Sequence, residues 1–274
     1  MDEIDPVLFR EFERAAHDRV ATSYEAFFAP ITANAALPLL DAVQASAGTR
    51  VLDVATGPGV VAAHAARRGA RVTGIDLSPR MVALAARISP DSTFLEADVE
   101  ALPFEASSFD AVVCAFGIGH FPDASAAMRE CARVLAPGGR LAIAWWDLPE
   151  RNRFQGVVLE AIQEVGARPP PNLPAGPPLF QYSEDTALAE LLGAAGLDDV
   201  AVATHPFVYR IADVEALWNG ALGSLARVSS LIHPQPAEVV EKIRRAFERR
   251  ARAYADNDGI TLPMSFKVAA GRKR

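Results

Sequence analysis

Val51-Leu-Asp-Val-Ala-Thr-Gly-Pro-Gly59 is the most informative stretch of this chain. Residues 51–55 form a short apolar run typical of a strand, and Gly57 and Gly59 follow in a turn that leads into a predicted helix over residues 60–68. A backbone that turns sharply at a strand end and then enters a helix needs residues without bulky Cβ groups. The first N–H groups of a helix have no partner within it. The stretch therefore predicts a strand–turn–helix unit that holds a ligand on its main chain.

Strands and helices alternate outward from this unit. Short apolar segments predict strands over residues 51–55, 71–75, 93–95, 109–116 and 141–146, and helices are predicted between them over 60–68, 81–88 and 123–135. The near-continuous apolar run over 109–116 is typical of a strand that is covered on both faces. This alternation with short turns predicts βαβ units and a parallel sheet.

Helices are also predicted before and after this region. The remaining predicted elements are helices over 6–47, 154–165, 183–195 (with Ser183 as N-cap), 214–228 and 237–255, strands over 200–209 and 261–269, and a proline-rich loop over 168–178. We expect an α/β fold: a Rossmann-like, doubly wound, seven-stranded sheet whose last strand is antiparallel. Residues 1–48 are expected to form an N-terminal helical cap and residues 49–274 the ligand-binding domain, with a helical cap insertion at about 212–258.

The composition narrows the class of function. A net charge of −7 over 274 residues gives no support for a nucleic-acid-binding face. Cys114 and Cys131 have neither CxxC spacing nor a nearby His cluster, so we expect buried free thiols and no metal site. The N-terminus is acidic where a signal peptide would be basic, and no apolar run reaches the roughly 18–20 residues that span a bilayer. We expect a cytoplasmic protein without membrane contact.

Three carboxylates fall at successive predicted strands and favour one ligand over another. The segment 57–62 fits the G-x-G-x-x-A pattern of dinucleotide-binding turns, which is weak support taken alone. Asp53 lies on the strand before the turn, where it would repel a pyrophosphate but suit the cationic amino-acid end of S-adenosylmethionine (SAM). Asp76 can accept the ribose hydroxyls of either ligand. Asp98 follows the third strand and can accept a hydrogen bond from an adenine amino group.

The stretch from about Val51 to Trp146 resembles the class I SAM-dependent methyltransferases, and most closely those similar to the ubiquinone and menaquinone biosynthesis C-methyltransferases. Five segments carry the resemblance in order: Val-Leu-Asp-Val-Ala-Thr-Gly-Pro-Gly (51–59), Gly-Ile-Asp-Leu-Ser-Pro-Arg-Met (74–81), Glu-Ala-Asp-Val-Glu-Ala-Leu-Pro-Phe (96–104), Ser-Phe-Asp-Ala-Val (108–112) and Arg-Val-Leu-Ala-Pro-Gly-Gly-Arg-Leu (133–141).

The resemblance implies SAM as cofactor and assigns roles at the matching positions. Asp53 and the turn residues Ala55, Thr56, Gly57 and Gly59 are implied to hold the methionine part, Asp76 the ribose, Leu77 and Met81 the adenine face, Asp98 and the Val99 amide the adenine edge, and Phe116 the surroundings of the sulfonium. One position departs from the pattern: Ala55 stands at the first glycine of the family's G-x-G-x-G turn. One added methyl group is expected to be tolerated there.

The acceptor is expected to be a small, hydrophobic or aromatic molecule that is methylated on oxygen or carbon. His120 is the candidate general base, because it follows the fourth strand and imidazole titrates near neutrality; an alternative is that it only orients the loop. Aromatic residues of the cap regions are the candidate substrate contacts: Tyr24, Phe28, Trp146, Tyr182 and Trp218. In proteins that resemble this one, a helix tyrosine near the position of Tyr24 closes over SAM.

Two other functions and the oligomeric state stay open. A SAM-binding protein without methyl transfer would carry the same cofactor residues. A nicotinamide-dependent oxidoreductase is disfavoured by Asp53 and Asp98. The long cap helices could pair two subunits in a homodimer, or their apolar stripes could form the core of the cap itself.

Overall fold

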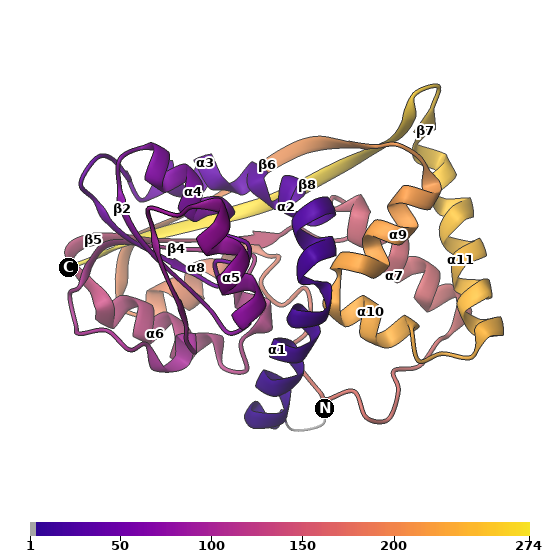
Figure 1. Cartoon of the computed structure of the whole chain (residues 1–274), viewed down its shortest axis with the longest axis horizontal. Coiled ribbons are helices and arrows are strands. Elements are labelled where there is room, and N and C mark those ends of the chain that lie inside the picture. Colours follow the sequence, from indigo (N-terminus) through magenta and orange to yellow (C-terminus); the bar gives the residue numbers. More distant parts are fainter. Residues whose placement is uncertain (1–3) are drawn as a thin grey trace.

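A single eight-stranded sheet forms the centre of the computed structural model, which describes residues 4–274 (Figure 1). Its strands are β1 (Arg50–Val54), β2 (Arg71–Asp76), β3 (Thr93–Glu96), β4 (Phe109–Ala115), β5 (Leu135–Trp146), β6 (Leu197–Ile211), β7 (Ala255–Asp256) and β8 (Gly259–Lys273). The order is β3-β2-β1-β4-β5-β8-β6, with the two-residue β7 paired to β8 off this path. Strands β1 to β5 pair in parallel, whereas β8 is antiparallel to β5 and β6. The predicted doubly wound sheet with an antiparallel last strand is confirmed, and β7 is an addition to it.

The winding of the sheet reverses at β1, which has β2 on one side and β4 on the other. Ligands of open α/β sheets bind in the crevice at the carboxyl ends of the strands beside such a reversal. In the register of the sheet, Val54 pairs with Ile75 of β2 and Cys114 of β4. The residues that follow these three strands therefore come together at one edge, as the positions of Asp53, Asp76 and Phe116 in the sequence suggested.

Helices cover both faces of the sheet and extend beyond its end. They are α1 (Pro6–Ser23), α2 (Ala29–Thr32), α3 (Ala36–Ala42), α4 (Val60–Arg67), α5 (Pro79–Ile88), α6 (Ala124–Val134), α7 (Arg153–Val165), α8 (Asp185–Ala194), α9 (Val214–Ser224), α10 (Ala226–Ile232) and α11 (Ala237–Ala251). A π-helical turn, Tyr24–Phe28, joins α1 to α2. Pro30 stands in the first turn of α2, directly after this π-helical turn.

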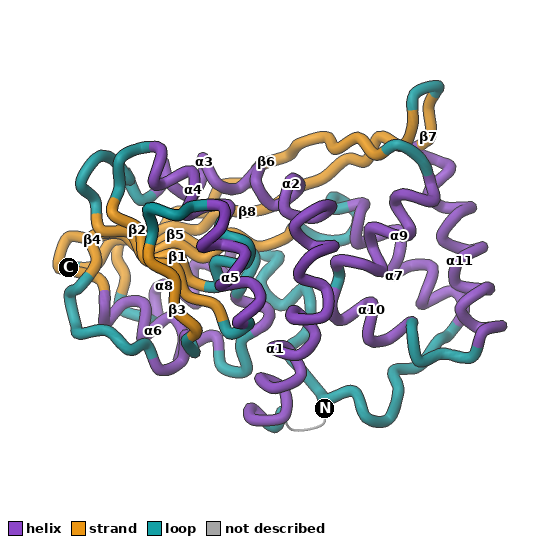
Figure 2. Tube along the Cα trace, viewed as in Figure 1, coloured by secondary structure: helices purple, strands orange, loops and turns teal. Residues whose placement is uncertain are grey.

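Helices α7, α9, α10 and α11 gather at the opposite end of the molecule from β2 and β3, and α1 runs between the two groups (Figures 1 and 2). The long strands β6 and β8 connect the ends, because they leave the sheet as a two-stranded ribbon that reaches these helices (Figure 2). The apolar face of α11 packs within the chain, against α7 and α9.

Two sequence-based expectations about helices are wrong. The helix predicted over 214–228 is broken at Leu225, whose backbone is extended, and this break turns α10 so that Arg227 faces a cavity described below. Ser183 is not the N-cap of α8: that position is Glu184. The Ser183 hydroxyl instead donates to the Trp146 carbonyl oxygen at 2.8 Å, because Ser183 is buried against the end of β5 and needs a partner there.

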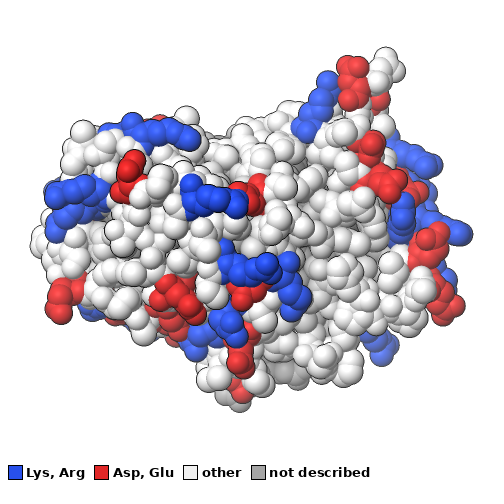
Figure 3. Space-filling view, viewed as in Figure 1, with Lys and Arg blue, Asp and Glu red and all other residues white. Residues whose placement is uncertain are grey.

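The surface and the thiols agree with the composition. Figure 3 shows acidic and basic side chains interspersed on the viewed face, with no continuous basic area on it. Cys114 and Cys131 are free and buried, as expected. Among residues 4–274, every helix is too short or too polar to cross a lipid bilayer.

Candidate active site

One cavity lies at the carboxyl ends of β1, β2 and β4 and extends beneath α1 and α10. Together with its open mouth it has a volume of about 1280 Å³. The predicted site residues that line it are Tyr24, Phe28, Ala55, Gly57, Asp76, Leu77, Met81, Asp98, Val99, Phe116, His120 and Trp146. The structure therefore brings together most of the predicted cofactor residues and three of the five predicted acceptor contacts.

The glycine turn forms one wall through residues in the left-handed backbone region. Gly57 and Gly59 have φ of 54° and 84°, and Ala55 has φ of 51°. A Cβ at Gly59 would lie 2.9 Å from the Cα of Ala85 in α5, so glycine is required there for close packing as well as for its φ. For Ala55, the same conformation costs about 1–2 kcal/mol. Strain of this kind is concentrated at functional sites.

Asp53 lies beneath this wall. Its Oδ2 accepts hydrogen bonds from the Thr56 hydroxyl at 2.7 Å and from the Ala62 N–H at 3.0 Å, which fixes the turn to the start of α4. Its Oδ1 is buried and has no partner among the described residues. Burial raises the pKa of Asp53 to about 7. Three predicted cofactor residues do not line the cavity directly: Asp53, Thr56 and Gly59. Their predicted effect on a ligand therefore has to pass through the backbone of the turn or through water.

The two further carboxylates stand at the mouths of β2 and β3. Asp76 accepts from the Gly57 N–H at 2.8 Å and from the Ser78 N–H at 2.9 Å, while burial raises its pKa. Asp98 accepts from the Glu100 N–H at 2.9 Å, and its Oδ2 lies 2.7 Å from Nε of Arg10 in α1. This ion pair, which was not predicted from the sequence, ties α1 to the edge predicted to hold adenine.

The other half of the cavity is aromatic. Phe116 follows β4 with φ of 59°, and its ring stacks on that of Trp146 with centroids 3.9 Å apart and an interplanar angle of 16°. The ring centroid of Phe28 lies 5.7 Å from that of Trp146. The rings of Phe28 and Tyr24 meet edge to face, with centroids 5.1 Å apart. Burial raises the pKa of Tyr24, which therefore stays a neutral phenol. Trp145 also lines this half of the cavity.

Two predicted acceptor contacts lie elsewhere. Tyr182 lines a second pocket, together with Asp123 and Pro178. Trp218 packs edge to face on Phe247 of α11, with ring centroids 5.1 Å apart, inside the group of cap helices. Both side chains are buried, but α9 presents Trp218 to α11 rather than to the cavity.

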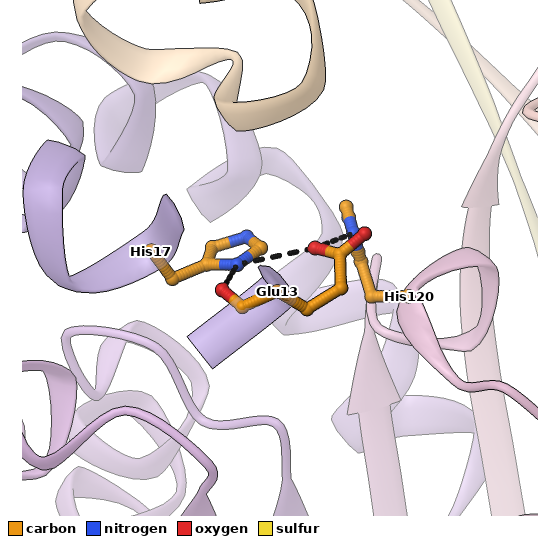
Figure 4. Close-up of side chains that lie close together, drawn as sticks. All are labelled: Glu13, His17 and His120. Atoms are coloured by element: carbon orange, nitrogen blue, oxygen red, sulfur yellow. Dashed lines mark hydrogen bonds and ion pairs between the residues drawn. The ribbon is translucent and has the colours of Figure 1, made fainter. Parts of the chain in front are cut away.

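A cluster around His120 includes residues that the sequence analysis missed. Nδ1 of His120 lies 3.0 Å from Oε2 of Glu13, and Arg227 donates from Nε to Oε1 of Glu13 at 2.7 Å. His17 donates from Nδ1 to the Glu13 carbonyl oxygen at 2.9 Å (Figure 4). The available signal was the burial stripe of α1: Glu13 stands between Phe9 and Ala16 at helical spacing, and a carboxylate on an apolar face is unusual.

The electrostatics of this cluster favour a charged Glu13 and a neutral His120. Burial opposes the ionisation of Glu13, but His120 and Arg227 outweigh it and lower the pKa of Glu13 to about 2. Burial lowers the pKa of His120, with Glu13 opposing that change. Glu13, His17 and His120 are of the types that bind metals, and their donor atoms lie within 4.8 Å. However, the guanidinium of Arg227 on Glu13 opposes a second positive charge at this place.

Gln155 of α7 is a further residue that the sequence did not single out. It lines the cavity, is 6% exposed, and its Oε1 has no hydrogen-bond partner within the described part of the chain. A buried amide oxygen without a donor costs about 1–3 kcal/mol. A ligand with an O–H or N–H group would satisfy it.

Comparison with known proteins relates the chain to one family. Residues 52–143 match the family described as Methyltransferase domain. The chain is 43% identical over 132 residues to the demethylmenaquinone methyltransferase of Thermus thermophilus. The matched stretch covers 46% of this chain and 60% of that protein. It is 36% identical over 160 residues to the demethylmenaquinone methyltransferase of Beutenbergia cavernae. That match covers 58% of this chain and 67% of that protein. The fold is similar to that of YcgJ from Bacillus subtilis, with a TM-score of 0.54 at 20% identity over 88% of this chain and 98% of that one.

Proposed function

Because the chain belongs to the class I methyltransferases, whose methyl donor is SAM, we propose that it methylates a small, hydrophobic and aromatic acceptor on oxygen or carbon. One observation carries the proposal: a single cavity joins the glycine turn and the strand-end carboxylates to an aromatic half, and His120 lines it. A reaction between a cofactor and an acceptor needs both to be held in one water-poor space.

The cofactor half suits SAM, which supplies an electrophilic methyl group when bound. The unpartnered Oδ1 of Asp53 provides a charge for the cationic end of the methionine part, directly or through water. Asp76 is proposed to accept the ribose hydroxyls, with Leu77 and Met81 against the adenine. Asp98 and the Val99 amide are proposed to read the adenine edge, and Phe116 to shield the reacting centre from water.

The acceptor half suits an aromatic ring. The stacked pair of Phe116 and Trp146, together with Tyr24 and Phe28, offers flat apolar surfaces on which a ring can lie. The relatives from Thermus thermophilus and Beutenbergia cavernae are demethylmenaquinone methyltransferases, which points to a quinone-type acceptor for those proteins. We therefore place hydroxylated aromatic molecules, hydroquinones among them, first among the candidate acceptors.

His120 is the proposed general base. Its lowered pKa leaves the imidazole neutral at pH 7, so it can take up a proton. Removal of the hydroxyl proton turns a weak oxygen nucleophile, or the ring carbon conjugated to it, into a strong one. The residue that performs this step must reach the acceptor, and His120 lines the cavity.

The helices outside the sheet are proposed to close the site. We propose that residues 1–48 and about 212–258 act as a cap on the methyltransferase domain, because α1 contributes Glu13 to the cavity and α10 contributes Arg227. Contacts of α1 with α5 on one side and α10 on the other place it between the two halves of the molecule (Figure 1).

The test is product formation from labelled cofactor. The purified full chain is incubated with methyl-deuterated SAM and a panel of phenols, hydroquinones and aliphatic amines, and the products are identified by mass spectrometry. We expect a deuterated methyl group on a hydroxylated aromatic compound, with one S-adenosylhomocysteine formed for each product. Binding of SAM without any labelled product across the panel would instead indicate a SAM-binding protein of another function.

A further inference from the structure

We propose that Glu13 is a positioning residue for His120: its carboxylate holds the imidazole in the tautomer that carries hydrogen on Nδ1, which leaves Nε2 as the free base toward the acceptor. The catalytic part of this inference rests on the proposed function, whereas the tautomer itself does not. This pair was not apparent from the sequence, because 107 positions separate Glu13 from His120.

The tautomer follows from what each group can donate. The carboxylate of Glu13 is ionised because its pKa is about 2, so it can only accept hydrogen bonds. Its Oε2 lies 3.0 Å from Nδ1 of His120, and therefore Nδ1 is the donor. A neutral imidazole carries one hydrogen, so Nε2 keeps its lone pair. Within residues 4–274 no protein group makes a hydrogen bond with Nε2, and His120 lines the cavity.

Glu13 is itself held in place. Its side chain is 4% exposed, and Arg227 donates to Oε1 at 2.7 Å. The other nitrogens of Arg227 donate to the carbonyl oxygens of Pro177 at 3.0 Å and of Gly119 at 2.6 Å. Because Gly119 precedes His120 in the chain, one guanidinium fixes both the carboxylate and the loop that carries the imidazole.

The groups that face His120 come from three elements. Glu13 and His17 come from α1 and Arg227 from α10, while the Trp145 ring of β5 lies edge to face with a centroid distance of 5.9 Å. His17 also meets the imidazole edge to face, with centroids 4.9 Å apart. Glu13 is the anion among these groups, so it is the one that stabilises the imidazolium formed after proton uptake.

For an oxygen acceptor, the proposed step moves one proton to His120 and one methyl group to the acceptor. The acceptor O–H bond breaks, and its proton moves to Nε2 of His120. The acceptor oxygen forms a bond to the methyl carbon while the methyl–sulfur bond breaks and its electron pair stays on sulfur. The imidazolium then returns its proton to solvent. Glu13 remains a carboxylate throughout, because it only orients and compensates charge.

The experiment is a two-bond ¹H–¹⁵N NMR spectrum of the full chain labelled with ¹⁵N-histidine, in which His120 is assigned by the loss of its signals in His120→Asn. At pH 7.5 we expect a protonated Nδ1 and an unprotonated Nε2 in the wild type. In Glu13→Gln the amide group can donate to Nδ1, so we expect a shift of His120 toward the Nε2–H form. Glu25→Gln is the matched control, since Glu25 pairs with Arg87 away from this cluster, and it is expected to keep the wild-type pattern.

Kinetics with an identified acceptor give the second readout. We expect Glu13→Gln to lower kcat about 100-fold with the KM for SAM unchanged, partial rescue by Glu13→Asp, and no added loss when combined with His120→Asn. A wild-type His120 that carries hydrogen on Nε2 would overturn the proposal, whether or not the variants fold. An unchanged His120 tautomer in folded Glu13→Gln would overturn it as well. Since the spectra need no acceptor, a failed search for methylated products leaves this test intact.

Discussion

The backbone N–H of Gly57 donates to Oδ2 of Asp76 at 2.8 Å, and this bond joins the turn after β1 to the last residue of β2. The other oxygen of Asp76 accepts from the Ser78 N–H at 2.9 Å. The carboxylate proposed to bind the ribose is therefore oriented by the protein before any ligand arrives. Such preorganisation lowers the ordering cost of binding.

Asp53 is expected to make stability and cofactor binding depend on pH in opposite directions. Burial raises its pKa from 3.8 to about 7, so between these values the folded chain holds a proton that the unfolded chain has lost. The contribution of this group to the free energy of unfolding therefore falls as the pH rises through this range. A cationic methionine end favours the carboxylate, so SAM affinity should rise from pH 6 to pH 8.

Urea unfolding and calorimetric SAM titrations at pH 5.5, 6.5 and 8 measure both trends, with Asp53→Asn as the matched variant. The variant keeps acceptors for Thr56 and Ala62 but cannot ionise, so both dependences should be weaker in it. Equal pH dependence of SAM binding in the two proteins would show that Asp53 does not provide the charge.

Ala55 is expected to be a position where glycine improves the fold. Its φ of 51° strains an alanine by about 1–2 kcal/mol. Glycine removes this strain, but it also increases the conformational entropy of the unfolded chain, which offsets part of the gain in stability. Ala55→Gly should raise the free energy of unfolding by up to about 1 kcal/mol and leave SAM affinity unchanged. Ala55→Val should lower both, because a β-branched residue suits this φ poorly. Thermal unfolding and SAM titration of the two variants check this, and a more stable Ala55→Val would contradict it.

Gln155 is expected to recognise the acceptor at a cost to stability. Replacing it with methionine removes the unpartnered Oε1, so the free energy of unfolding should stay the same or rise by about 1 kcal/mol. The KM for a hydroxylated acceptor should rise roughly tenfold, since one hydrogen bond is lost, with the KM for SAM unchanged. Gln163→Met, on the exposed face of α7, is the control. An unchanged acceptor KM in Gln155→Met would remove Gln155 from the acceptor site.

Methyl transfer is expected to be independent of bound metal. The guanidinium of Arg227 lies 2.7 Å from Oε1 of Glu13 and opposes a cation between Glu13, His17 and His120. Dialysis against EDTA should therefore leave the rate of S-adenosylhomocysteine formation and the melting temperature unchanged. A loss of rate in EDTA that is restored by Zn²⁺ would mean that this cluster is a metal centre.

The parts of the fold that follow from local patterns were predictable. The run 51–59, the apolar strand β4 and the carboxylates Asp53, Asp76 and Asp98 lie in segments whose apolar runs and turns are visible in the local sequence. The break at Leu225 was not predictable, because the residues around it have helical propensity and periodicity, whereas in the structure the backbone of Leu225 is extended. The hairpin of β7 and β8 depends on how far β8 extends beyond the other strands of the sheet.

The site was predictable on its cofactor side and much less on its acceptor side. The cofactor residues lie between Asp53 and Phe116, among the alternating strands and helices of the sheet, whereas Glu13, Gln155 and Arg227 come from helices whose placement depends on tertiary packing. Aromatic content alone did not separate Trp146, which faces the cavity, from Trp218, which faces Phe247. Which side of a helix meets a cavity is decided by its packing partners.

The most direct test of the account is calorimetric titration of the full chain with SAM, S-adenosylhomocysteine and NADH, repeated on Asp76→Ala. We expect both adenosyl ligands to bind the wild type, roughly 100-fold weaker binding in Asp76→Ala from the lost charged hydrogen bonds, and no heat with NADH. Binding of NADH without binding of either adenosyl ligand would contradict the account and make the turn after β1 a dinucleotide site.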